Sequence, residues 1–160
     1  EKNDFPCTSQ KVIATCIKRD SFVSHYTHFW NQNLIRGLFN DFETRIAIPT
    51  PTDKLTIMSD GNNDYTIVLP EYFDVDCINY GQKIKTKDGK KVFPSIKKIV
   101  YGKLNPDDIE TNTVESVNSV LREKLSRLHR KTKKISKNKY SLDSSVWLFK
   151  FAWNFIHKRY

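Results

Sequence analysis

The sequence predicts a single α/β domain, and three features near its start lead to that prediction. Residues 11–17 and 22–29 are rich in β-branched and aromatic side chains and are separated by the turn sequence KRDS, which is typical of a β-hairpin. Residues 30–46 carry apolar side chains at helical spacing, and residues 54–60 form a short apolar strand. With 160 residues, of which 38% are hydrophobic, the chain is long enough for one sizeable core and too short for two independent ones.

The middle of the chain has a less distinct pattern. Residues 62–73 contain a proline and fit either a short helix or a strand, whereas residues 75–80 favour another short strand. Residues 81–108 alternate lysines with apolar side chains around an Asp-Gly turn signal, which fits either a flexible basic flap or a small extra hairpin. We therefore treat residues 82–111 as a variable insert.

The last element, residues 142–160, is predicted to be a helix that packs into the domain. Its main apolar stripe and the residues that widen this stripe are Val146, Phe149, Trp153, Ile156, Tyr160, Trp147, Leu148, Phe151 and Phe155. A helix that is apolar over most of its circumference is usually buried. Such an aromatic cluster can also stack on nucleic-acid bases, but core packing is the simpler expectation.

The cysteines and histidines form no recognisable disulfide or zinc pattern. Cys7, Cys16 and Cys77 are odd in number and widely spaced, so they are expected to be buried or free thiols. His25 and His28 lie three apart in a predicted strand, which places them on opposite faces. We therefore expect neither a disulfide framework nor a zinc site.

Several function classes lack their sequence signatures. The chain shows no signal peptide, no apolar run long enough to span a bilayer, and no Walker-type loop among its five glycines. A soluble, cytoplasmic protein without a membrane partner or a P-loop is expected. The chain begins at Glu1 without a methionine, which suggests a fragment or a processed chain.

Residues 113–139 combine a carboxylate with the most basic run of the chain. Val114, Val117, Leu121, Leu125 and Leu128 form an apolar helical stripe, and Glu115, Asn118, Ser119, Arg122 and Ser126 form a polar face. From Arg122 to Lys139 there are nine Lys or Arg and one acid, a local balance of +8 in a chain of net charge +9. Such a run is often a solvated helix face. Because like charges repel one another and a polyphosphate offsets them, nucleic acid is the expected partner here.

Asp60 is the second candidate carboxylate, because it ends the strand at residues 54–60. An Asp before Gly is common in turns, but the C-terminal end of a strand is also where α/β sheets place their ligands. Carboxylates from a strand end and a helix suit hard cations such as Mg²⁺, and two such ions about 4 Å apart promote in-line displacement at phosphorus. Asp60 and Glu115, next to a basic helix, therefore predict phosphodiester chemistry on nucleic acid.

The stretch TVESVNSVLREKLSRLHRKTKKISK resembles the C-terminal signature of DDE-type insertion-sequence transposases, especially those similar to the first-described bacterial insertion sequence. The matching positions, in order, are Glu115, Asn118, Leu121, Arg122, Arg127, Leu128, Arg130, Lys131, Thr132 and Ser136. The upstream IMSDG resembles the segment with the family's second catalytic aspartate, which assigns that role to Asp60. The resemblance extends from residue 11 to about residue 160 and is strongest in the last third of the chain.

The resemblance implies an RNase H-like fold, a mixed sheet with an antiparallel hairpin and flanking helices. It further implies that three acids hold two Mg²⁺ or Mn²⁺ ions for cleavage of a transposon end and transfer to target DNA. DNA contacts are expected from Asn118, Arg122, Arg127, Arg130, Lys131, Lys133, Lys134 and Lys137. A homo-oligomer in the active state and a prokaryotic, nucleoid-associated location are also expected.

Two departures from the family pattern limit this expectation. The family's first aspartate lies on a strand before the hairpin, and Asp4 is the only acid near that place, so we expect an N-terminally incomplete domain or the descendant of a complete one, in which the absence of this acid would abolish catalysis. In addition, Ser116 replaces an arginine that often follows the glutamate, and the interval between the two acids is longer than in compact relatives.

Two other functions stay open. A non-enzymatic basic nucleic-acid-binding domain would tolerate Asp60→Asn and Glu115→Gln without effect. A metal-dependent nuclease or resolvase of the same fold would hydrolyse DNA without joining it.

Overall fold

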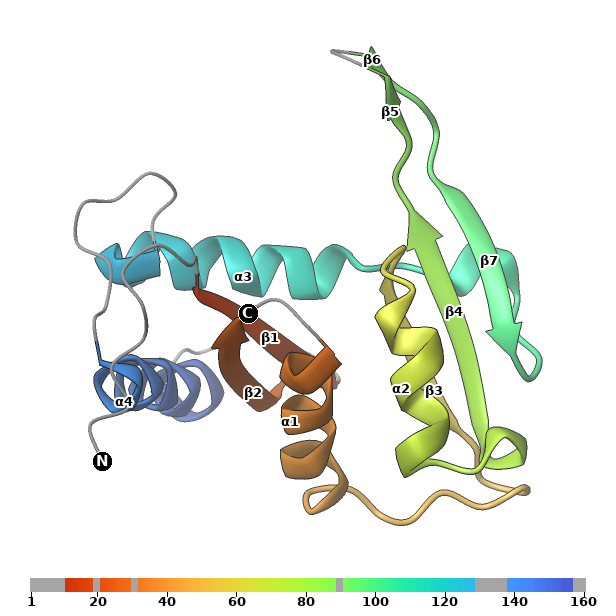
Figure 1. The fold of residues 1–160 in the computed structure, drawn as a ribbon, viewed down its shortest axis with the longest axis horizontal. Coiled ribbons are helices and arrows are strands. Elements are labelled where there is room, and N and C mark those ends of the chain that lie inside the picture. The colour runs from red at the N-terminus through yellow and green to blue at the C-terminus, as the bar shows by residue number, and fades with distance from the viewer. Residues whose placement is uncertain (1–10, 19–20, 30–31, 89–90, 129–137, 157–160) are drawn as a thin grey trace. The chain divides into compact units, whose positions relative to one another are not determined.

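The computed structural model describes residues 11–18, 21–29, 32–88, 91–128 and 138–156. The chain divides into two compact units. Unit 1 comprises the residues up to Arg45 and those from Thr113 onward, and unit 2 comprises Ile46–Asn112. The structure is of the mixed α/β class that the sequence predicts (Figure 1).

Unit 1 begins with the predicted β-hairpin. Strand β1 (Lys11–Lys18) pairs antiparallel with β2 (Ser21–Phe29), with Lys11 opposite Phe29. The register shifts between Cys16 and Ile17. The β-branched and aromatic residues in both segments explain why the pattern alone predicted these strands.

Helix α1 (Gln32–Glu43) follows the hairpin and packs against β2. Its predicted apolar positions, Leu34, Ile35, Leu38, Phe39 and Phe42, are all buried. Gly37 permits this close packing, because a Cβ atom at this position would lie 2.3 Å from the ring of Tyr26 on β2. The amphipathic helix predicted from residues 30–46 is therefore confirmed over Gln32–Glu43.

The other helices of unit 1 come from the C-terminal third of the chain. Helix α3 (Asn112–Lys124) enters unit 1 at Thr113 and is followed by the 3₁₀ turn η3 (Ser126–Leu128). Helix α4 (Lys139–Phe151) continues into the π-helical turn η4 (Ala152–Ile156). The hairpin, α3 and α4 share one core made of Phe22, Val117, Leu121, Leu142, Val146 and Phe149.

Two side chains attach α4 and η4 to the backbone of β2. The side chain of Asn154 accepts a hydrogen bond from the Phe22 N–H (2.8 Å) and donates one to the Phe22 carbonyl (2.9 Å). Lys150 Nζ donates to the carbonyl of Val23 (3.0 Å). Asn154 thereby satisfies both backbone groups of Phe22, as a neighbouring strand would.

The expectation that the last helix packs into the domain on all its apolar sides is wrong. Its core face is buried, but Trp147, Leu148, Phe151, Phe155 and Ile156 are exposed. The reason is geometric, because β2 and α3 meet only one side of α4 and leave the opposite apolar side uncovered among the described residues of unit 1.

Unit 2 contains a three-stranded mixed sheet in the order β3-β4-β7. Strand β3 (Leu55–Asp60) is parallel to β4 (Ile78–Ile84), which pairs antiparallel with β7 (Ile96–Tyr101). Helix α2 (Asp64–Tyr72) and the short 3₁₀ turn η1 (Val75–Cys77) connect the two parallel strands. The strand predicted to end in Asp60 is thus confirmed.

Residues 62–73, which fit either a helix or a strand, contain helix α2. Pro70 lies inside this helix and has no N–H to donate to the carbonyl of Thr66. The hydroxyl of Tyr101 on β7 donates to that carbonyl instead (3.0 Å). A tertiary contact therefore compensates for the proline within the helix.

The variable insert is largely a hairpin. Its first residues complete β4, and β5 (Lys87–Asp88) and β6 (Lys91–Val92) form a two-stranded extension before β7 returns to the sheet. The 3₁₀ turn η2 (Pro106–Asp108) follows. We call residues 83–103 the basic ribbon, and Figure 1 shows β5 and β6 projecting beyond the three-stranded sheet.

The core of unit 2 joins α2 to the sheet through Val68, Leu69, Phe73, Cys77, Ile78, Tyr80 and Ile109. Cys77 is a buried free thiol, as predicted. The Tyr80 hydroxyl lies 2.7 Å from Ser59 Oγ and accepts from Gln82 Nε2 (2.9 Å). Burial raises the pKa of Tyr80, so this network holds the ends of β3 and β4 together with a neutral phenol.

Replacing Gly102 with alanine should destabilise unit 2. Gly102 has φ +70°, and an added Cβ atom would lie 2.2 Å from Asn79 Oδ1, which accepts from the Lys103 N–H. We expect the free energy of unfolding to fall by about 2 kcal/mol in chemical denaturation. The control Lys103→Ala alters an exposed side chain and should change it little, so equal effects in the two variants would contradict this account of the turn.

Candidate functional site

Asp60 is exposed at the C-terminal end of β3. Its register partner on the parallel strand β4 is Lys83, and its Oδ1 accepts from the Asn62 N–H (3.3 Å). The turn chemistry expected of an Asp before Gly is therefore present. Asp60 also lies where α/β sheets bind their ligands, at the end of parallel strands next to the start of a helix.

A second polar cluster in unit 2 was missed by the sequence analysis. Glu110 forms ion pairs with Lys83 and with Lys97, the latter at 3.0 Å, and Lys83 Nζ also lies 3.3 Å from Asn112 Oδ1. Hydrogen bonds from the two lysines hold the pKa of Glu110 below its ordinary value. Because its charge is already matched, Glu110 is a poorer metal ligand than Asp60.

Glu115 is exposed in the first turn of α3, where its negative charge interacts favourably with the helix dipole. The predicted division of this helix into two faces is confirmed. Val117 and Leu121 are buried, whereas Ser119 and Arg122 are exposed, as is Glu115. Asn118 is half-buried at the border between the two faces.

The two candidate carboxylates belong to different units, Asp60 to unit 2 and Glu115 to unit 1. Each presents exposed oxygen ligands of the kind that Mg²⁺ prefers, so the chemistry of both side chains fits a hard cation. Within the described ranges, no three His, Cys, Asp or Glu side chains gather into a metal-binding group. Asp4, the only acid near the place of the family's first aspartate, lies outside the described residues.

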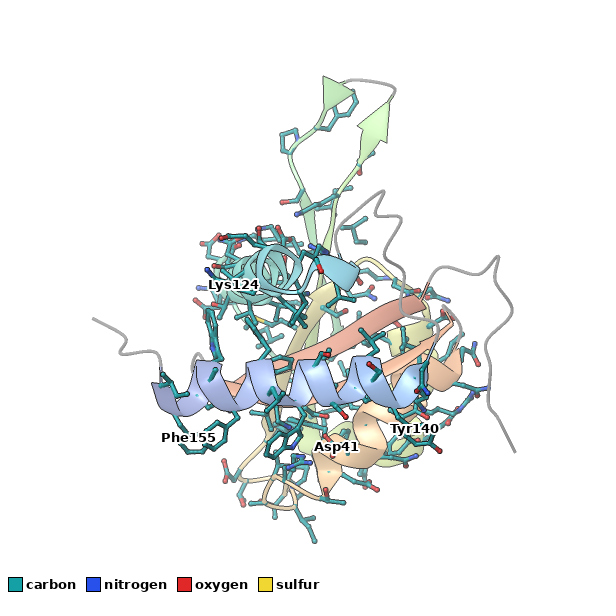
Figure 2. The ribbon with its side chains drawn as sticks, turned by 90° about the vertical axis from the view of Figure 1, so that its left-hand side faces the viewer. Asp41, Lys124, Tyr140 and Phe155 are labelled. Atoms are coloured by element: carbon teal, nitrogen blue, oxygen red, sulfur yellow. The ribbon has the colours of Figure 1, made fainter. Side chains whose placement is uncertain are left out.

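The predicted DNA-binding residues are described only in part. Asn118 and Arg122 lie on α3, and Arg127 lies in η3. Arg130, Lys131, Lys133, Lys134 and Lys137 lie outside the described residues. Lys124, labelled in Figure 2, adds a further exposed cation at the end of α3 and lies 3.6 Å from Glu123.

The basic ribbon is a second positive segment, which the site prediction left out. It contains eight lysines and one acid, a balance of +7. Because residues 122–139 carry +8 and the whole chain +9, the remaining residues carry −6. Lys98 and Lys103 are exposed on the ribbon, whereas Lys83 and Lys97 pair with Glu110. Counting lysines along the insert would have identified this segment from the sequence.

Unit 1 contains an open cavity of about 480 Å³ between β2, α1 and α4. Its lining residues are His25, Tyr26, Gly37, Asn40, Asp41, Thr44 and Asp143. Asp41 accepts from Ser24 Oγ (2.6 Å) and from Arg45, and Figure 2 labels its position. Although burial raises the pKa of Asp41, these hydrogen bonds hold it below its ordinary value.

His25, set aside in the sequence analysis, is a half-buried neutral imidazole in this cavity. Its Nδ1 atom is buried and has no hydrogen-bond partner among the described residues. Burial, assisted by the charge of Lys150, lowers the pKa of His25 to about 4. No property of the sequence distinguishes such a histidine from an exposed one, because its burial arises from α1 and α4 packing around β2.

The pKa of His25 makes unit 1 sensitive to acid. The unfolded chain protonates this residue near its ordinary pKa of 6.5, so stability present above that pH is lost as the pH falls toward 4. Between about pH 7 and about pH 5 we expect a loss of about 2 kcal/mol in the free energy of unfolding. In His25→Gln this part of the pH dependence should vanish, whereas an unchanged pH profile in denaturation experiments would refute the assignment.

Comparisons of the chain with protein-family models, with curated proteins and with solved structures found no match. In the parts of the chain that the structure describes, no helix combines the length and apolar character needed to cross a bilayer. Assignment of function therefore depends on the residues themselves and on their positions within each unit.

Proposed function

We propose that this chain is a DNA-processing domain of the DDE transposase type. The observation that carries the proposal is the placement of two exposed acids. Asp60 ends a strand that is parallel to its neighbour, and Glu115 lies in the first turn of a later helix with a basic end. The order of hairpin, helix, acid-ending strand, helix and parallel strand, followed after β5, β6 and β7 by the acid-bearing helix, supports the RNase H-like fold that the transposase resemblance implies, although the hairpin forms a sheet of its own.

Divalent ions suit these two side chains. Asp60 and Glu115 would each offer Mg²⁺ or Mn²⁺ the hard carboxylate oxygens that these ions prefer. When bound, such ions stabilise the charge that develops around phosphorus during an in-line displacement. Arg122 lies two turns after Glu115 on the same helix face, so its guanidinium can neutralise a phosphate of the DNA that enters the site.

The charge distribution supports DNA as the substrate. The two basic segments carry +7 and +8, whereas the rest of the chain is negative. Segregation of charge into two segments favours a polyanion, because each phosphate contact releases condensed counterions. A two-stranded ribbon also has dimensions that fit the major groove of B-DNA.

Removing either carboxylate should weaken divalent-ion binding. We expect Asp60→Asn and Glu115→Gln each to lower the affinity for Mn²⁺ by at least about tenfold in the presence of DNA, measured by electron paramagnetic resonance of the free ion. Asp53→Asn and Glu123→Gln serve as matched controls, since both alter exposed carboxylates, one in each unit. Equal affinities in all four variants would exclude Asp60 and Glu115 as ligands.

A second candidate is a nucleic-acid-binding domain without catalysis. It is favoured by the basic ribbon, whose exposed lysines can bind phosphates without any metal. In this case, supercoiled DNA incubated with the chain and Mg²⁺ stays intact. If the chain nicks this DNA, and if Asp60→Asn abolishes the nicking whereas Asp53→Asn retains it, the result supports the enzyme. Hydrolysis without joining identifies a nuclease or resolvase.

The ribbon lysines should contribute to the salt dependence of DNA binding. We expect the double variant Lys98→Ala/Lys103→Ala to reduce the slope of log affinity against log salt by about 1 to 2, because each lost phosphate contact removes about 0.9. Lys54→Ala, which removes an exposed lysine outside the ribbon, should leave the slope unchanged. Fluorescence anisotropy with a DNA duplex measures this slope, and identical slopes in both variants would exclude the ribbon from the interface.

A further inference from the structure

Helix α4 and turn η4 present exposed apolar side chains on the side opposite their core face. We call it the exposed stripe, and it consists of Tyr140, Trp147, Leu148, Phe151, Phe155 and Ile156. Their exposed fractions run from 45% for Phe151 to 75% for Phe155. Figure 2 shows α4 in the foreground, with Tyr140 near one end and Phe155 near the other.

The aromatic rings of the stripe contact one another, and their helix is anchored to β2. The rings of Trp147 and Phe151 stack with centroids 6.0 Å apart, and those of Phe151 and Phe155 lie 5.1 Å apart. On the other side of the helix, Asn154 is bonded to both backbone groups of Phe22. Because the rings support one another and their helix is anchored, a partner can bind here without ordering a flexible segment first.

The stripe carries no charge. The charged residues among positions 138–156 are Lys139, Asp143 and Lys150, and all three are engaged elsewhere in unit 1. Lys139 Nζ lies 4.7 Å from the centroid of the Tyr26 ring, Lys150 donates to Val23, and Asp143 lines the His25 cavity. Surfaces that stack on nucleic-acid bases combine aromatic rings with basic side chains, and within positions 138–156 both lysines are engaged elsewhere, so an apolar protein surface is the better match.

The size of the stripe suits a dimer interface. The five side chains from Trp147 to Ile156, which the two-fold arrangement below can bury, each expose roughly 100 to 200 Å² and together offer roughly 600 to 700 Å². That area approaches the ~800 Å² that each partner contributes to a stable protein interface. It lies at the upper end of the ~300 to 600 Å² of the largest apolar patch on a typical monomer.

The spacing of the aromatic rings makes the stripe complementary to itself. Trp147, Phe151 and Phe155 recur every four residues, so the pattern is symmetric about Phe151. In an antiparallel pair of helices, a two-fold axis at Phe151 would place Trp147 of each copy against Phe155 of the other. Such isologous contacts are the commonest way in which identical chains associate. Because the stripe residues are uncharged, two copies of this +9 chain can approach each other along the stripe with less repulsion than along their basic segments.

We propose that the exposed stripe is a dimerisation surface, on which a second copy of this chain packs its own α4 in antiparallel orientation. This inference does not depend on the proposed function, because it uses only α4, η4 and their contacts within unit 1.

Sedimentation equilibrium of the full chain at physiological salt tests the proposal. We expect a monomer–dimer equilibrium in which Trp147→Glu and Phe155→Glu each raise the dissociation constant by at least about tenfold, since each buries a charge at the interface. Circular dichroism should show that both variants keep their fold, as the altered side chains are exposed. Ile48→Glu is the matched control, because Ile48 is 89% exposed and lies in unit 2.

A mixing experiment tests the antiparallel register. Trp147→Glu and Phe155→Lys should each associate weakly alone, and their equimolar mixture should form a heterodimer, because the new carboxylate at 147 faces the new amine at 155. A parent chain that stays monomeric, or variants that dimerise as the parent does, would overturn the proposal. Loss of DNA affinity in Phe155→Glu with unchanged self-association would overturn it too and identify a base-stacking surface.

Discussion

The packing of Phe22 is the constraint on which unit 1 depends. Its side chain is fully buried among residues of α3 and α4, and its backbone N–H and carbonyl both bond to Asn154. One residue of the hairpin therefore sets the position of both C-terminal helices. The same packing turns the polar face of α3, with Glu115, and the exposed stripe of α4 toward solvent. Both candidate surfaces of unit 1 follow from the packing of this one residue.

In unit 2, the hydroxyl of Tyr80 has the corresponding role. It joins Ser59 on β3 to Gln82 on β4, and the three buried polar groups satisfy one another. The network lies one residue before Asp60, so it keeps the end of β3 paired while the carboxylate itself remains in solvent. A buried polar network thus positions Asp60, the candidate metal ligand, while its carboxylate stays exposed.

Much of the architecture could be predicted from local patterns. The hairpin, α1, β3 and the two faces of α3 follow from periodicity, because each buries a face whose spacing is visible in the sequence. Helix α2 could not be assigned, since its proline is compensated by Tyr101, 35 residues away in the chain. The exposed side of α4 could not be predicted either, because hydrophobicity shows which side chains can be buried but not how many neighbours are available to cover them.

The candidate site, like the fold, could be predicted from the sequence only in part. The identities of Asp60 and Glu115, the basic run after α3 and the lysine content of the ribbon are properties of the sequence, because chemistry and charge belong to the residues themselves. Tertiary structure decided that Glu110 is neutralised by two lysines, that His25 lies in a cavity with Asp41, and that the aromatic rings of α4 face outward. These outcomes depend on which elements meet in three dimensions, since a side chain's pairing and burial are set by neighbours that are distant along the chain.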